Sequence, residues 1–446
     1  MERHLYERIK TFRGGANFAM PGHKGRVDFD FDFADDWTEI TGADNLLNPE
    51  EVIAATQEEI ARAYGVKKSV VIPAGSTAGI KLALYLAANP GDTVLVQRNS
   101  HLSLFHGAVE LDLRLRYLPA KVDESTGLFS GVDPADVAQA LDEDPSIAAV
   151  FLTSPDYFGG ILALKDIANI VRARGKMLIV DEAHGAHLAF TPLKEYSAVR
   201  WADITVQSLH KTMAALTGAA LVHRNSEVNE GKILKGMRLF LSTSPSYLIM
   251  LSTEYAVARG ETFPWARLLA MRAKIIERLP QVQFSGNRGG YMVAVDPMKL
   301  LFHVKGYRGD EVVRALAEKG VYLEMGDAYY ALAILSPENT EEDVDRLIVA
   351  IDSLSEREEK APLPKAFYPK TDAVYSPREA FFRATETLAL TEASGRVAAE
   401  NVTPYPPGIP LVTYGERITE ETIRAIERNG ISSGLKDGKI TVIKEA

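Results

Sequence analysis

Hydrophobic and polar positions alternate in a regular order over residues 69–224, where short apolar runs are separated by amphipathic stretches. The apolar runs predict buried strands at 70–73, 93–96, 115–118, 148–152, 177–180, 204–207 and 219–222. The stretches between them predict helices at 77–88, 102–111, 134–141 and 164–174. This alternation is typical of an α/β fold, here with a mostly parallel seven-stranded sheet covered by helices on both faces.

The N-terminal part of the chain has a different pattern. Residues 1–48 show weak periodicity and are expected to form an N-terminal arm. A helix is predicted to follow, with Asn48 as its cap, Pro49 in its first turn and Gly65 at its end. We expect this helix to begin a large domain that spans residues 49–280.

Two smaller α+β units are predicted after the large domain. Strand signals at 290–295 and 321–324, with helices at 310–319 and 340–354, indicate a small domain over residues 281–360. A proline-containing linker at 361–365 then leads into a C-terminal domain over residues 361–446. This last domain is expected to contain a helix at 420–428 and a strand at 439–443.

Composition narrows the class of protein. The 446 residues are 46% hydrophobic and 25% charged, as in a globular protein. Neither a membrane-spanning run nor the apolar stretch of a signal peptide is evident, so a cytoplasmic location is expected. The absence of cysteine excludes disulfides, thiolate metal ligands and thiol nucleophiles. A formal charge of −10 disfavours nucleic acid as a partner and is compatible with a small cationic substrate.

Two chemically suggestive side chains follow adjacent predicted strands. Asp181 comes directly after strand 177–180, and Lys211 follows strand 204–207 within Ser208-Leu209-His210-Lys211. A lysine amine can hold an aldehyde as a Schiff base, and a carboxylate can keep a pyridine nitrogen protonated. Each residue alone is common in α/β proteins, but together they predict a site for pyridoxal 5′-phosphate (PLP).

A glycine-rich turn supports this interpretation. Ala74-Gly75-Ser76-Thr77-Ala78-Gly79 joins a predicted strand to a helix, where backbone N–H groups and hydroxyls can bind a phosphate, although such a turn is often only a helix cap. Thr153 also follows a strand. Because ligands bind beyond the carboxyl ends of parallel strands, we expect Gly75, Thr153, Asp181 and Lys211 to converge there.

Several histidines and hydroxyls lie beside these positions. His101, after strand 93–96, can stack on a pyridine ring, or it can be a capping or surface histidine. Ser208 and His210 flank Lys211 and can bind phosphate or orient the amine. His184, three residues beyond Asp181, is expected to hydrogen-bond that acid and fix its orientation.

The sequence disfavours two other kinds of site, a metal site and a serine-hydrolase site. Asp181, Glu182, His184 and His187 are metal-ligand types within seven residues, but they follow a buried strand and no further cluster completes the set, so no metal is predicted. A serine hydrolase is disfavoured because the chain has no Gly-x-Ser-x-Gly elbow.

Together these motifs resemble the group I PLP-dependent decarboxylases of ornithine, lysine and arginine, in the aspartate-aminotransferase class (fold type I). The resemblance runs through Met20-Pro21-Gly22-His23-Lys24-Gly25 and through segments 73–79, 98–103, 181–187, 208–212, 243–247 and 405–410. The length is similar to that of the short forms without the N-terminal wing domain.

The resemblance implies roles for individual residues. Lys211 would hold the cofactor as a Schiff base, Asp181 would pair with the pyridinium and His101 would stack on the ring. The phosphate would be held by Ser76, Thr77, Ser208 and His210, and Gly75 and His184 would also belong to the cofactor site. A neighbouring subunit would complete the phosphate site with Ser242, Thr243 and Ser244, so a homodimer would be the smallest active unit.

The chain departs from the family pattern at Gly218, at Asp156 and in the segment from Glu254 to Val257. Gly218 stands where a glutamine is usual, Asp156 where a threonine is usual, and Val257, three residues after the acid Glu254, where an arginine is usual. These changes leave the PLP residues intact and bear on substrate identity.

The resemblance favours decarboxylation of a basic L-amino acid to CO2 and a polyamine-pathway amine. Arginine is the first expected substrate, because short forms include arginine decarboxylases, followed by lysine or ornithine. A cationic side chain requires an acid, for which Glu324 is the first candidate and Asp44 the second, unless each is simply a surface acid. The alternatives are an aminotransferase or aldolase, with Arg288 for the substrate carboxylate, and a non-catalytic PLP-binding scaffold.

Overall fold

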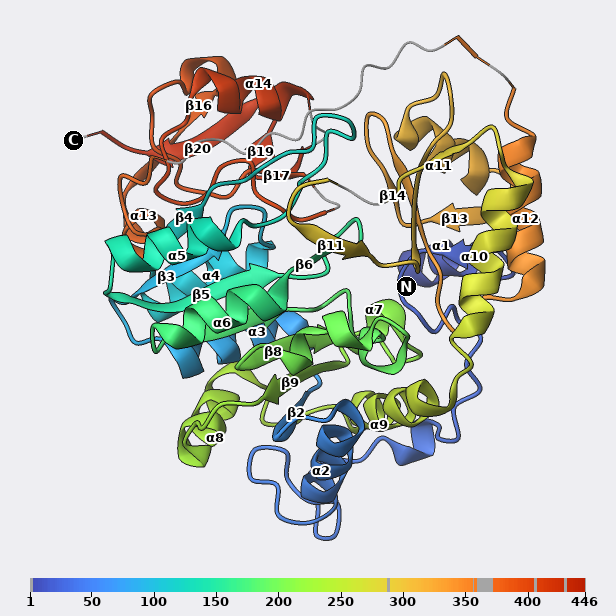
Figure 1. Cartoon of the computed structure of the whole chain (residues 1–446), viewed down its shortest axis with the longest axis horizontal. Helices are drawn as coiled ribbons and strands as arrows, with labels where there is room; N and C mark the ends of the chain where they lie inside the picture. The colour runs from blue at the N-terminus through green and yellow to red at the C-terminus, as the bar shows by residue number, and fades with distance from the viewer. Residues whose placement is uncertain are drawn as a thin grey trace.

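The computed structural model describes residues 3–286, 289–355, 357–358, 372–404, 407–428 and 431–445 (Figure 1). Arg288, the predicted linker at 361–365 and Tyr405-Pro406 lie outside the described residues. Three regions surround the site: a large sheet with its helices, a smaller α+β unit, and a C-terminal unit on the opposite side (Figure 1).

The large unit is built on a seven-stranded sheet, which confirms the predicted fold class. Its strand order is β2-β9-β8-β7-β5-β3-β4, and only β9 runs antiparallel to its neighbours. The strands are β2 (Lys68–Ile72), β3 (Thr93–Gln97), β4 (Arg114–Leu118), β5 (Ile147–Thr153), β7 (Met177–Asp181), β8 (Ile204–Ser208) and β9 (Ala220–Arg224). Each predicted strand is therefore present, with ends shifted by one or two residues.

Both faces of this sheet are buried, as the apolar runs predict. Because successive side chains of a strand point to opposite faces, Ile179 of β7 packs in one core, while Leu178 and Val180 pack in another. The helices of the first core are α2 (Val52–Tyr64), α3 (Gly75–Ala87), α4 (Leu102–Leu111) and α8 (Glu230–Phe240). Those of the second are α5 (Pro134–Glu143) and α6 (Leu164–Ala173).

The start of α2 differs from the prediction. The helix begins at Val52, and Asn48 does not cap it, since its side chain instead donates to Glu50. Asp44 takes the capping role, because its carboxylate accepts the backbone N–H groups of Glu50, Glu51 and Ile53. Gly65 ends the helix as predicted, with a left-handed φ of 67°.

The small unit has its own core around a four-stranded sheet of order β10-β12-β15-β14. Its elements are α10 (Ala266–Arg278), β10 (Gln283–Phe284), β12 (Lys299–His303), α11 (Gly309–Ala317), β14 (Met325–Gly326), β15 (Ala331–Ile334) and α12 (Glu341–Asp352). Helix α9 (Tyr247–Thr262) precedes it. A short antiparallel pair that the sequence did not predict as a pair, β6 (Gly160–Leu162) with β11 (Met292–Val295), ties it to the large unit.

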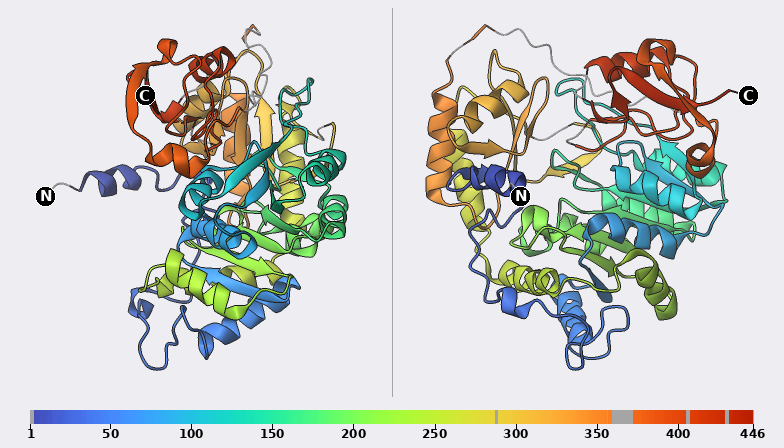
Figure 2. Two further views of the ribbon diagram at one scale, coloured as in Figure 1. Left: turned by 90° about the vertical axis from the view of Figure 1, so that its left-hand side faces the viewer. Right: turned by 180° about the vertical axis from the view of Figure 1, so that it is seen from behind.

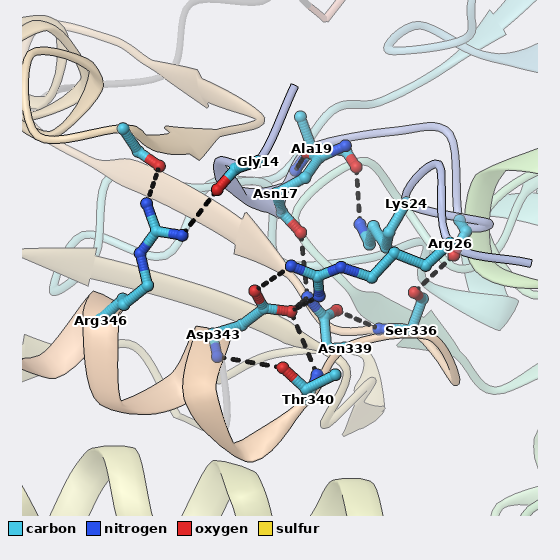
Figure 3. A network of polar contacts seen from close by, with 12 residues as sticks. Gly14, Asn17, Ala19, Lys24, Arg26, Ser336, Asn339, Thr340, Asp343 and Arg346 are labelled. Carbon is cyan, nitrogen blue, oxygen red and sulfur yellow. Dashed lines mark hydrogen bonds and ion pairs between the residues drawn. The ribbon is translucent and has the colours of Figure 1, made fainter. Parts of the chain in front are cut away.

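The N-terminal segment is clasped onto the small unit (Figure 3). Its strand β1 (Ala16–Phe18) pairs in parallel with β13 (Val321–Leu323). Arg26 makes a two-pronged ion pair with Asp343 of α12, and the Asn339 side chain donates to the carbonyl of Asn17 at 2.9 Å. Helix α1 (His4–Lys10) has no buried residue, and it extends away from the body (Figure 2).

The C-terminal unit packs against the large unit through α13 (Pro377–Phe382) and α4 (Figure 2). Its separate core lies among β16 (Thr385–Ala389), α14 (Glu420–Arg428), β19 (Leu435–Lys436) and β20 (Lys439–Ile443), with β17 (Thr403–Pro404) and β18 (Ile431–Ser433) as a second pair. The predicted boundaries at residues 48, 280 and 360 stay predictions; in the structure, Ala16 and Phe18 of the N-terminal segment and helix α10 pack in the core of the small unit. Among the described residues, no helix has the length and apolar character needed to cross a membrane.

Candidate active site

The predicted site residues follow the carboxyl ends of parallel strands. Asp181 ends β7, Thr153 ends β5, and Lys211 lies in the single turn α7 (Leu209–Thr212) directly after β8. His101 is the N-cap of α4, which follows β3, and Gly75 begins α3 after β2. Since these strands point the same way, residues far apart in the sequence meet at one edge of the sheet.

Lys211 and Asp181 influence each other's charge. Burial lowers the pKa of the Lys211 amine, while the negative charges of Asp181 and Glu324 oppose that shift. Burial raises the pKa of the Asp181 carboxyl, and the positive charge of Lys211 and a hydrogen bond from the Ala183 N–H at 3.0 Å oppose it. A buried acid of this kind is placed to pair with a cationic ring nitrogen.

His184 does not make the hydrogen bond to Asp181 that the sequence predicts. Its Nε2 lies 3.1 Å from Lys211 Nζ, and its Nδ1 lies 2.8 Å from Lys299 Nζ. Burial and the two neighbouring lysines, Lys211 and Lys299, lower the pKa of His184 well below its ordinary value, so the ring is neutral. Tertiary packing thus brings it to the lysine amine instead of the acid.

His101 both caps a helix and approaches Lys211. Its Nδ1 accepts the Ser103 N–H at 3.2 Å, which is the capping alternative considered for this residue. Burial, with the charge of nearby Lys211, lowers the pKa of His101 to about 4. The imidazole is therefore neutral near pH 7, as suits a ring that stacks on a pyridine.

The C-terminal unit holds the segment that carries His101. Buried Arg98 pairs with Glu416 at 3.0 Å and donates to the carbonyls of Pro410 and Leu411. The Leu102 N–H also donates to the Gly408 carbonyl at 3.0 Å. The second half of the motif at 405–410 thus contacts the segment next to the histidine.

The predicted phosphate loop offers backbone N–H groups that no capping side chain occupies. Gly75 has a φ of 78°, and a Cβ added there would meet open space. Ala74 offers no side-chain cap, so the helix N-terminus keeps N–H groups for an anion, beside the partly buried Ser76 and the exposed Thr77. Ser208 Oγ, at the end of β8, is buried without a hydrogen-bond partner among the described residues.

An orphaned buried hydroxyl and an open glycine turn, beside a lysine and an acid, fit PLP. His210 is nearby and partly buried, its Nδ1 lies 3.1 Å from the Ala219 carbonyl oxygen, and burial lowers its pKa to about 4. Ser242, Thr243 and Ser244 lie together between α8 and α9 and are exposed. Their side chains are therefore accessible to another subunit.

Glu324 and Asp44 differ sharply as candidate substrate acids. Glu324 accepts the Tyr157 hydroxyl at 2.7 Å and the Met20 N–H at 2.8 Å, and its charge is felt at Lys211. Burial would raise the pKa of Asp44, but four backbone hydrogen bonds outweigh it and lower that pKa. Asp44 caps the N-terminus of α2, so this acid has a local structural role.

Thr153 reaches the site edge with its hydroxyl unengaged. Its Oγ1 is buried and has no hydrogen-bond partner among the described residues, while its N–H donates to the Gln97 side chain at 3.2 Å. An unpaired buried hydroxyl at the end of β5 is available to a bound molecule.

The residues in which the chain departs from the family pattern have structural parts in the fold. Gly218 has a φ of 102°, a region that favours glycine, and its carbonyl accepts the Gly75 N–H at 2.8 Å. Asp156 accepts the N–H groups of Phe158 and Gly160 and so shapes a turn. Val257 is buried in the large core, and Glu254 accepts the Thr56 hydroxyl between α9 and α2.

Three residues of the site were missed by the sequence analysis: Lys299, Lys24 and Tyr157. Lys299 contacts His184, and Tyr157 contacts both Glu324 and the His184 ring. Lys24 is buried and donates to the Ala19 carbonyl at 2.6 Å, and burial lowers its pKa to about 7. A signal existed for Lys299, which interrupts the apolar run Met298-Lys299-Leu300-Leu301-Phe302, and for Lys24, which lies in the N-terminal motif.

The acid and histidine side chains at 181–187 diverge. Glu182 binds Ser197, Ala198 and Gln207, and His187 Nε2 lies 3.1 Å from Asp296. Burial raises the pKa of Glu182 to about 8, which suits a structural acid. Within the described part of the chain, no three side chains of metal-ligating types are grouped to hold an ion.

Comparisons with known proteins agree with this geometry. The family model described as Orn/Lys/Arg decarboxylase, major domain, matches residues 9–290, and the model for the C-terminal domain of the same family matches residues 360–427. An arginine decarboxylase of Bacillus subtilis is 30% identical, covering 97% of this chain and 94% of the relative. An arginine decarboxylase of Bacillus anthracis is 27% identical over 95% of this chain and 91% of its own length.

A solved structure shows the same fold. The lysine decarboxylase LdcF of Francisella novicida superimposes with a TM-score of 0.78 at 20% identity, covering 92% of this chain and 74% of that one. The fold is therefore that of PLP fold type I enzymes, and the resemblance found in the sequence is confirmed. The chain belongs to the Orn/Lys/Arg decarboxylase family and is a PLP-dependent decarboxylase of basic amino acids.

Proposed function

We propose that the enzyme decarboxylates a basic L-amino acid, with arginine as the first substrate and lysine or ornithine next. The single observation that carries this proposal is Glu324, a carboxylate held by Tyr157 and Met20 and close enough to affect the charge of Lys211. Similarity to arginine decarboxylases over nearly the whole chain supports the choice of arginine. The amine product would serve polyamine synthesis in the cytoplasm.

Each residue of the site has a proposed part. Lys211 would bind the cofactor aldehyde, Asp181 would face the ring nitrogen and His101 would stack on the ring. Gly75, Ser76, Thr77, Ser208 and His210 would hold the phosphate, with His184 beside the lysine. Thr153 and Glu324 would contact the substrate.

The chemistry divides between cofactor and protein. PLP supplies an electron sink for the electron pair released when the bond to the carboxylate breaks. Glu324 would orient the substrate through its cationic end and so place the carboxylate away from water. The proton that replaces CO2 on the α-carbon would come from Lys211 Nζ or His101. The low pKa of His101, about 4 because of burial, favours Lys211 as the donor.

The direct test measures CO2 and amine from arginine, lysine and ornithine, each with the purified, PLP-loaded protein. We expect amine from arginine first, and the Lys211→Ala variant should lose both the visible absorbance of the bound cofactor and turnover. If the cofactor binds and no amine forms from any of the three, the proposal is wrong. A keto-acid product with the cofactor left in its amine form would instead indicate an aminotransferase.

Glu324 and Asp44 offer a matched test of substrate binding. Glu324→Gln keeps the shape and removes the charge, so we expect KM for the preferred substrate to rise about tenfold or more. Asp44→Asn is the control and should leave KM unchanged. An increase in KM for Asp44→Asn but not for Glu324→Gln would reverse the assignment.

A homodimer is proposed as the active unit. Exposed Ser242, Thr243 and Ser244 support this, because their side chains are accessible to another subunit. Light scattering should give twice the chain mass, and Thr243→Ala should weaken PLP binding without changing that mass. A fully active monomer would contradict the proposal.

A further inference from the structure

Lys299 is a buried cationic side chain without a bonded carboxylate. It lies in β12, is 2% exposed, and its Nζ contacts His184 Nδ1 at 2.8 Å. Among the described residues, no acid comes within ion-pair distance of it. Burying an ammonium in this way is costly, so a neighbouring group that shares its proton is needed.

That neighbour links Lys299 to the cofactor lysine. His184 Nε2 lies 3.1 Å from Lys211 Nζ, so one imidazole contacts two amines through its two nitrogens. A neutral imidazole has one N–H donor and one acceptor nitrogen. One lysine therefore donates an N–H to the unprotonated nitrogen of His184, and the other accepts the imidazole N–H through the lone pair of a neutral amine.

The surrounding charges favour the proton on Lys299. Burial lowers the pKa of Lys299 to about 8, and the charge of Lys211 adds to that shift. The negative charges of Asp296, Glu324 and Asp156 oppose it. Lys24 also faces this group and repels it. Only Asp181 and Glu324 support a charge on Lys211, and Asp181 is the acid that would serve the cofactor ring.

We propose that Lys299 is a positioning residue, which donates a hydrogen bond to His184 Nδ1 so that His184 Nε2–H donates to Lys211 Nζ and holds Lys211 as the neutral amine in the PLP-free protein. The neutral amine is the form that can attack an aldehyde carbon. Removing the positive charge of Lys299 should let Lys211 take up a proton. The proposal rests on Lys211 being the cofactor lysine and holds whichever amino acid is decarboxylated.

The test measures the proton affinity of Lys211 in the PLP-free protein. Trace labelling with acetic anhydride across a pH series, quantified by mass spectrometry of the peptide that contains Lys211, reports the fraction of neutral amine. In Lys299→Met we expect Lys211 to label about tenfold more slowly at pH 7, with its profile displaced to higher pH. Lys299→Arg keeps the charge and should restore most of the labelling.

Lys305→Met, at an exposed lysine just beyond the same strand, is the matched control and should leave the profile unchanged. Circular dichroism would establish that each variant is folded. A Lys299→Met profile that overlays the wild-type profile would overturn the proposal. Slower labelling of Lys211 in Lys299→Met that Lys299→Arg fails to restore would also overturn it, because the positive charge would then not be the cause.

A second measurement needs no Lys299 variant. In the wild-type protein labelled with 15N-histidine, His184 should show the tautomer with a proton on Nε2 and none on Nδ1, assigned by comparison with His184→Gln. The opposite tautomer would refute the proposed direction of donation. Neither experiment uses a substrate, so failure to decarboxylate arginine, lysine or ornithine would leave both results standing.

Discussion

Arg98 and Lys299 are both 2% exposed, yet they are surrounded very differently. Arg98 has a carboxylate partner, Glu416, and two backbone carbonyls, and it joins the large and C-terminal units. Lys299 contacts one nitrogen of the His184 imidazole, and the other nitrogen of that ring contacts the cofactor lysine, Lys211. A buried charge that is paired with a carboxylate stabilises an interface, whereas one that contacts a neutral imidazole is suited to chemistry.

The residue types match these two uses. Arginine stays protonated in proteins, and its planar group can serve several acceptors at once. Lysine changes its pKa readily when buried, as Lys299, Lys24 and Lys211 do here because of desolvation. The variants below test whether a buried cation that is paired with a carboxylate contributes to stability, and whether one without a carboxylate partner does not.

The largest effect is expected on activity, from Lys211→Ala. Loss of the amine that binds the cofactor should lower amine production on the order of a thousandfold or more, because nucleophile and proton donor are lost together. The free energy of unfolding of the PLP-free protein should not fall. Product assays and urea unfolding measure the two quantities, with Lys305→Ala as control; equal activity in both variants would contradict the prediction.

Glu416→Ala tests the paired cation. Arg98 would remain buried without its carboxylate, and the free energy of unfolding should fall by about 3–5 kcal/mol. Urea unfolding measures this, and the exposed Glu400 in the same unit provides the control substitution Glu400→Ala. A loss as small as that of Glu400→Ala would show that the pair is not structural.

Lys299→Met, in contrast to Glu416→Ala, should not lower the free energy of unfolding. Methionine fills a similar volume without a buried charge, so the free energy of unfolding should stay constant or rise by about 1 kcal/mol. Urea unfolding of the PLP-free protein is the measurement. A loss comparable to that of Glu416→Ala would end the distinction between the two buried cations.

The pair of Arg26 and Asp343 in the N-terminal clasp should show a small pH effect (Figure 3). Burial raises the pKa of Asp343, but the hydrogen bonds from Arg26 and Thr340 outweigh it and lower that pKa below its ordinary value. A lowered pKa contributes stability above the unfolded pKa, near 4, that is lost as the pH falls through the folded pKa. Asp343→Asn should therefore flatten the pH dependence of thermal unfolding below about pH 5; an unchanged slope would contradict it.

The elements of the large sheet were predictable because each apolar run is long enough to be buried on both faces. Shorter pieces were not: β6 has three residues, and only its pairing with β11, from another unit, makes it a strand. Asn48 and Asp44 are both plausible caps by residue type, and only the path of the chain decided for Asp44. His184 was correctly placed beside the site, but its contacts are made to lysines 27 and 115 residues away.

By itself the sequence determined that Asp181 and Lys211 each come after an apolar run, because local periodicity marks both strands. It also carried the motifs of the family. The structure shows that these two strands are parallel neighbours. Only the tertiary structure decided which partners those side chains meet. It brought Lys299 from the small unit to His184, and Glu416 from the C-terminal unit to Arg98. Such contacts depend on how separate cores pack together, and the hydrophobic pattern of one segment carries no record of the charged groups that another segment brings to it.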